Sequence, residues 1–69
     1  MENEIKNAVK LHAEGMIEKH RINALNLMKN PVGIGEHGDI VEEIQKELDS
    51  IAKYHDYLEI LGVYFEEWH

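Results

Sequence analysis

Two histidines and a glutamate are the residues of this chain best suited to bind a metal ion. His12 and His55 sit on the apolar sides of two segments with helical spacing, and Glu59 follows His55 by one helical turn. If the segments fold back on each other, His12 faces His55. Because imidazole and carboxylate groups are ordinary ligands of zinc and related metals, His12, His55 and Glu59 form a candidate metal site. The alternative is a core histidine that fixes helix register through one hydrogen bond.

The stretch between the two segments spells the pattern GxGxxG with Gly33, Gly35 and Gly38. In dinucleotide-binding folds this pattern follows a β-strand within a βαβ unit of about 30 residues. Here a helical segment precedes it, and Glu36 and Asp39 would repel a pyrophosphate. We therefore predict no cofactor, and we expect the glycines to permit positive φ in a compact connection.

Nucleophilic catalysis has few candidate residues in this sequence. Ser50 is the only serine, and threonine and cysteine are absent. No histidine stands three or four positions from Ser50 to act as its base. The sequence therefore predicts a protein that is not an enzyme.

The candidate residues have to be positioned by helices, and the first expected helix covers residues 4–29. Its main apolar stripe contains Ile5, Val9, His12, Ala13, Met16, His20, Ala24 and Leu27. A second apolar line lies away from that stripe and contains Ala8, Leu11, Ile22 and Leu25. A helix with two apolar faces has more surface to bury than one hairpin partner covers, which favours an assembly of several chains.

A loop over residues 30–39 separates the two helices. Pro31 disfavours helical geometry at Asn30, so the first helix is expected to end there. Asp39 with Glu42 three positions later has the spacing of a capping box, which predicts the start of the second helix.

The second helix is expected over about residues 40–61. Its heptad seam contains Val41, Ile44, Leu48, Ile51, His55, Leu58, Gly62 and Phe65. Gly62 either ends the helix or is a small residue at a tight crossing. The tail over residues 62–69 is rich in aromatic side chains, and we expect it to pack on a partner chain.

Size and composition favour a single helical domain, residues 1–69, that gains stability by self-association. A core this small rarely contributes more than about 3–5 kcal/mol, and without cysteine there is no disulfide to add to it. No apolar run is long enough to span a membrane, and the N-terminus lacks the features of a signal peptide. We therefore expect a cytoplasmic protein without membrane contact.

Negative charge is concentrated in the second half of the chain. Residues 1–30 carry five basic and four acidic side chains, whereas residues 31–69 carry two basic and ten acidic ones. Such a surface repels phosphate backbones, so no direct contact with nucleic acid is expected. It is either a solvated face or a surface for a basic partner. The candidate partner-binding residues are Glu43, Glu47, Asp49, Tyr64 and Trp68.

The loop and the helix after it carry a resemblance. Residues 30–54, from Asn30-Pro-Val-Gly-Ile-Gly-Glu-His-Gly-Asp39 to Tyr54, and the upstream His12-Ala-Glu-Gly-Met16 resemble small uncharacterised proteins of marine tailed cyanophages. This resemblance implies a phage source, and hence the cytoplasm of the host cell or the virion. It implies no activity and no functional residue.

These observations combine into one expectation of fold and three of function. The fold is expected to be all-α, an antiparallel helical hairpin that assembles into a homodimeric four-helix bundle. The leading hypothesis for function is a non-enzymatic protein–protein interaction module, such as a phage accessory or host-modulating protein. The alternatives are a metal-binding bundle and an acidic decoy that occupies a nucleic-acid-binding site.

Overall fold

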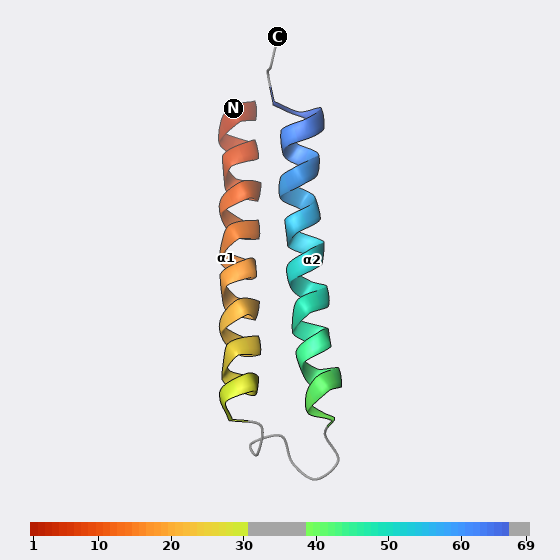
Figure 1. Cartoon of the computed structure of the whole chain (residues 1–69). Helices are drawn as coiled ribbons and strands as arrows, with labels where there is room; N and C mark the ends of the chain where they lie inside the picture. Colours follow the sequence, from red (N-terminus) through yellow and green to blue (C-terminus); the bar gives the residue numbers. More distant parts are fainter. Residues whose placement is uncertain (31–38, 67–69) are drawn as a thin grey trace.

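The computed structural model describes residues 1–30 and 39–66, which form two long α-helices lying side by side (Figure 1). Helix α1 is Glu2–Lys29 and helix α2 is Ile40–Tyr64. The described residues contain no β-strand. The start of α1 and the end of α2 lie at the same end of the molecule, so the helices are antiparallel (Figure 1). The predicted all-α class and the packing of two helices are confirmed.

Both helix ends next to the loop follow from their local sequence. Asn30 leaves helical geometry, with φ −133° and ψ 64°, just before Pro31. Asp39 has extended backbone, and its carboxylate accepts hydrogen bonds from the backbone N–H groups of Val41 and Glu42 at 2.9 and 3.3 Å. The side chain thus satisfies two N–H groups that have no partner within the helix. The three loop glycines, at 33, 35 and 38, lie outside the described residues.

We expect replacement of Asp39 by alanine to lower the free energy of unfolding by about 1 kcal/mol, because the cap is lost. Asp39→Asn is the control, since its side-chain oxygen can still accept from the same N–H groups. Thermal unfolding followed by circular dichroism measures both variants. Equal melting temperatures for the two would contradict the capping role.

The far ends of the helices extend slightly beyond the predicted ranges. Helix α1 begins at Glu2 rather than residue 4, and α2 continues through Gly62 to Tyr64. Gly62 therefore does not end the helix. A β-carbon added at Gly62 would meet nothing within 4 Å, so it is not at a tight crossing of the two helices either.

The face of α2 that packs on α1 differs from the predicted seam. Half-buried side chains follow the heptad spacing Ile40, Ile44, Glu47, Ile51, Tyr54, Leu58 and Leu61. The shared positions Ile44, Ile51 and Leu58 agree with the prediction. The prediction was wrong for the alternate positions, because Val41, Leu48, His55 and Gly62 are exposed, and it was wrong for Phe65, which is exposed as well. The seam is turned toward Glu47, which has hydrogen-bond partners on α1.

On α1, the middle and the loop end of the predicted stripe pack on α2. Ala13 and Ala24 are the buried residues of the described chain, with 1% and 4% of their surface exposed. Small side chains at these two positions allow the helices to approach closely. Near the N-terminus the prediction was wrong, because Ile5 and Val9 are 57% and 43% exposed.

At the open end of the hairpin, α1 supplies a positive charge to the C-terminus of α2. Lys6 Nζ donates a hydrogen bond of 2.6 Å to the carbonyl oxygen of Phe65, the C-cap residue. The last turn of α2 contains no basic residue of its own. The lysine therefore complements the negative end of the α2 dipole from the neighbouring helix.

The molecule is elongated, with principal extents of 53 × 17 × 16 Å. Its radius of gyration of 15.7 Å compares with about 11 Å for a compact domain of this length. Neither helix combines the length and apolar character that crossing a lipid bilayer requires, as far as the described residues show.

Candidate functional site

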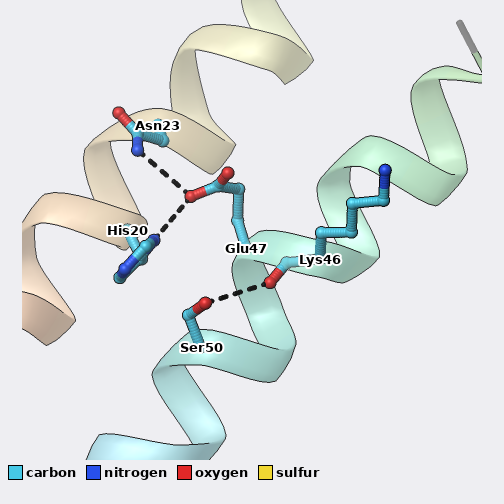
Figure 2. Close-up of polar contacts among 5 residues, drawn as sticks. All are labelled: His20, Asn23, Lys46, Glu47 and Ser50. Atoms are coloured by element: carbon cyan, nitrogen blue, oxygen red, sulfur yellow. Dashed lines mark hydrogen bonds and ion pairs between the residues drawn. The ribbon is translucent and has the colours of Figure 1, made fainter.

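A cluster of three polar side chains joins the two helices in the half of the hairpin nearer the loop (Figure 2). Glu47 of α2 accepts a hydrogen bond from His20 Nδ1 at 2.7 Å and another from Asn23 Nδ2 at 3.1 Å, both at the same carboxylate oxygen. The His20 and Glu47 side chains are only 16% and 21% exposed. This is therefore a partly desolvated contact, in which hydrogen bonds are stronger than on the open surface.

The charge of Glu47 is stabilised by this arrangement. Its pKa is held below the usual value, mainly by the hydrogen bond from His20, while partial burial acts in the opposite direction and the bond from Asn23 adds to the lowering. The carboxylate thus stays ionised at neutral pH inside the hairpin. Glu47 was predicted to bind a partner protein, but in the structure its side chain turns toward α1.

The sequence did not lead us to predict this cluster, because the pattern of each helix does not show which residues of the other helix it meets. His20 was placed on the core-facing stripe of α1, whereas Glu47 was expected on the surface as a partner-binding residue and not as a partner of His20. The signal available in advance was the pair His20 and Asn23, whose side chains lie on one side of α1 and share a need for an acceptor. An acidic residue at the same level of α2 satisfies that need.

Aromatic rings continue from this cluster toward the open end. The ring of Tyr54 stacks on His20, with centroids 6.4 Å apart and an interplanar angle of 15°. His12 meets the same ring edge-on at 5.9 Å, and Tyr57 meets it edge-on at 5.5 Å. Tyr54 therefore packs between two histidines of α1 and joins them to the contact between the helices.

The three candidate metal ligands are only partly gathered. His55 Nε2 lies 3.1 Å from Glu59 Oε1, and both side chains are more than half exposed. His12 packs instead on Tyr54 and does not complete the group. Within residues 1–30 and 39–66, no three histidine, aspartate or glutamate side chains are placed to share a metal ion. The expected meeting of His12 and His55 is thus replaced by contact with the preceding residue of α2.

The other candidate partner-binding residues do not form one surface. Glu43 is paired with Lys46 at 3.1 Å on its own helix. Asp49 is exposed but lies well around the helix from Glu43 and Glu47. Tyr64 is 73% exposed at the end of α2, and Trp68 lies outside the described residues. The predicted set is therefore not one surface: Glu47 lies in the contact between the helices, Glu43 and Asp49 lie elsewhere on α2, and Tyr64 lies at the open end of the hairpin.

Ser50 is also accounted for by local structure. Its hydroxyl donates a hydrogen bond of 3.3 Å to the carbonyl oxygen of Lys46, one turn earlier in α2 (Figure 2). This is the back-bonding that serine commonly makes within helices.

The outward sides of the two helices differ sharply in character. On α2, the side turned away from α1 carries Glu42, Asp49 and Asp56, all exposed and spaced by seven residues. We call these three residues the acidic stripe. On α1, the side turned away from α2 is mostly apolar between residues 8 and 25, and its Leu11 and Ile22 are 59% and 43% exposed.

No protein-family model, curated protein sequence or solved structure matched this chain when it was compared with each. The candidate functions therefore have to be judged on the geometry of the hairpin itself.

Proposed function

We propose that this chain is a non-enzymatic interaction protein that forms a four-helix homodimer and docks on a basic protein partner through the acidic stripe. The observation that carries the docking part is the position of Glu42, Asp49 and Asp56 on the side of α2 that the hairpin does not use. Such an array attracts a complementary positive surface and speeds the encounter with it.

The charge of the acidic stripe is only partly compensated by the lysines of the same helix. Helix α2 contains two, Lys46 and Lys53. Lys46 pairs with Glu43, and Lys53 lies over the ring of Tyr54 at 5.0 Å from its centroid. Lys46 is also attracted electrostatically to Glu42, although its hydrogen bond is with Glu43. The three carboxylates of the stripe outnumber the two lysines beside them, so the stripe keeps a net negative charge.

Self-association is supported by the small amount of surface that one hairpin buries. The accessible surface is 5549 Å², whereas a compact monomer of 8.0 kDa exposes about 4,400 Å². The excess is about 1,100 Å², and a standard interface buries about 800 Å² per partner. A second hairpin would therefore cover an area of the size that this chain leaves exposed.

The resemblance to cyanophage proteins leads us to propose a phage accessory or host-modulating role in the host cytoplasm. A lysate of a marine cyanobacterium is accordingly the material in which to seek the partner. We expect the immobilised full chain to retain a defined set of basic proteins and to release them at high salt, because exposed charge interactions are screened.

Neutralising the acidic stripe tests the proposal. We expect the triple variant Glu42→Gln, Asp49→Asn and Asp56→Asn to lose these captured proteins, as measured by quantitative mass spectrometry of the eluates. The matched control, Glu2→Gln, Glu4→Gln and Glu66→Gln, changes the net charge equally at other exposed positions. Equal capture by the stripe variant and the wild type, or equal loss in both triple variants, would contradict docking through the stripe.

A further inference from the structure

The outer face of α1, on the side opposite α2, is an apolar line that the hairpin leaves without a partner. Ala13 and Ala24, which contact α2, lie roughly 180° around the helix from its centre. Between residues 8 and 25, the exposed residues of this outer face are Ala8, Leu11, Gly15, Glu18, Ile22 and Leu25. A helix that is apolar on two opposite sides is typically covered on both.

Gly15 stands near the middle of this outer face and of α1 itself. Glycine inside a helix costs about 1 kcal/mol relative to alanine. A β-carbon at Gly15 would meet nothing within 4 Å, so packing within the hairpin does not require a glycine there. Another helix can approach the outer face closely at this position, because glycine has no side chain.

Glu18, the charged residue in the middle of the outer face, is already paired. Arg21 donates two hydrogen bonds to its carboxylate, at 2.6 and 3.0 Å, and this pairing lowers the pKa of Glu18. The two-bond geometry holds both side chains along the helix surface. The outer face can therefore be covered without leaving a carboxylate alone.

We infer that the outer face of α1 binds the same face of a second copy, with the two α1 helices antiparallel about a two-fold axis between Met16 and Ile17. This inference rests on the homodimer proposed above and specifies its interface. The spacing of the outer face is symmetric about that point, which pairs residue 8 with residue 25, 11 with 22, and 15 with 18 of the second copy. A two-fold interface requires such self-complementarity.

Charge favours the antiparallel orientation over the parallel one. Glu14 and Arg21, seven residues apart, lie on one flank of the outer face. Antiparallel pairing brings Glu14 beside Arg21 of the second copy. The two-fold axis also brings Arg21 beside Glu14 of the second copy. Parallel pairing instead places Glu18 against Glu18 of the second copy. The acidic stripe points away from this interface, so it remains open to the proposed partner.

Disulfide trapping tests the orientation, because the chain has no cysteine of its own. We expect an oxidised mixture of the full-length variants Ala8→Cys and Leu25→Cys to give a cross-linked dimer, and either variant alone to give little. In an antiparallel dimer, two copies of residue 8 are about 25 Å apart. Cross-linking of each variant alone would overturn the inference in favour of a parallel pair. Gln45→Cys on α2 is the control for random collision. If the mixture of the Ala8→Cys and Leu25→Cys variants cross-links no better than this control, the outer face of α1 is excluded as the interface.

The affinity of the dimer gives a second, independent measurement. We expect Glu14→Arg to raise the dimer Kd about tenfold, because the substituted side chain would place a second positive charge against Arg21 of the second copy. Glu66→Arg makes the same charge change beyond the end of α2 and should leave the Kd unchanged; an equal effect of both variants contradicts the interface. Sedimentation equilibrium of the wild type separates the two claims. A monomer refutes the proposed homodimer, whereas a dimer that fails the cross-linking test refutes only this interface.

Discussion

Replacing Ala13 by aspartate is expected to abolish the folded hairpin at neutral pH. Ala13 is 1% exposed and lies where α1 and α2 meet. A carboxylate at this position would lose its hydration, and burying an unpaired charge costs several kcal/mol. A core as small as this one contributes only about 3–5 kcal/mol, so the substitution removes most of the stability. Loss of the helical circular dichroism signal and of a cooperative melting transition measures the effect.

Ala52→Asp is the matched control for this prediction. Ala52 lies on α2 and is exposed, so the same substitution there changes charge and helix propensity without burying a carboxylate. We expect the Ala52 variant to keep its cooperative transition with a small decrease in melting temperature. Similar transitions in both variants would show that the two helices do not meet at Ala13.

The ends of the helices at the loop could be predicted because they depend on residues that act locally. Proline constrains the residue before it, and an aspartate at an N-cap uses N–H groups two and three positions away. Both Asn30 and Asp39 accordingly mark boundaries in the structure. The extension of α2 past Gly62 was not predictable in the same way, since a single glycine can either continue a helix or end it.

The rotation of α2 could not be predicted from its own pattern. Two lines with heptad spacing share Ile44, Ile51 and Leu58, and hydrophobicity alone favours the line through Leu48 over the one through Glu47. The structure uses Glu47 because His20 and Asn23 on α1 supply hydrogen-bond donors at its level. That preference belongs to the pair of helices and is absent from either helix alone. The predicted meeting of His12 and His55 fails for the same reason, because the rotation of α2 exposes His55 and places Tyr54 beside His12.

Acid is expected to weaken the hairpin through Glu47. Because the pKa of the folded carboxyl is lower than its ordinary value of 4.5, the ionised form is favoured in the folded state. Its contribution to the free energy of unfolding is present above the unfolded pKa and is lost as the pH falls through the folded pKa. We therefore expect the stability advantage of the wild type over Glu47→Gln to shrink as the pH falls below the ordinary carboxyl pKa of 4.5. Chemical denaturation of both proteins at each pH measures it, and a constant difference would contradict this role.

At neutral pH, truncation of the same residue should have a larger effect than removal of the charge alone. Glu47→Ala leaves His20 Nδ1 and the Asn23 amide without their acceptor in a partly buried contact, which costs about 1–3 kcal/mol. Glu43→Ala, one turn earlier on α2, removes only a pair with Lys46 within the helix and should cost less than about 0.5 kcal/mol. If both variants lose stability equally, Glu47 acts as another surface carboxylate. A large loss in Glu47→Ala alone means that a polar contact between the helices sets the rotation of α2, and with it the outward direction of the acidic stripe.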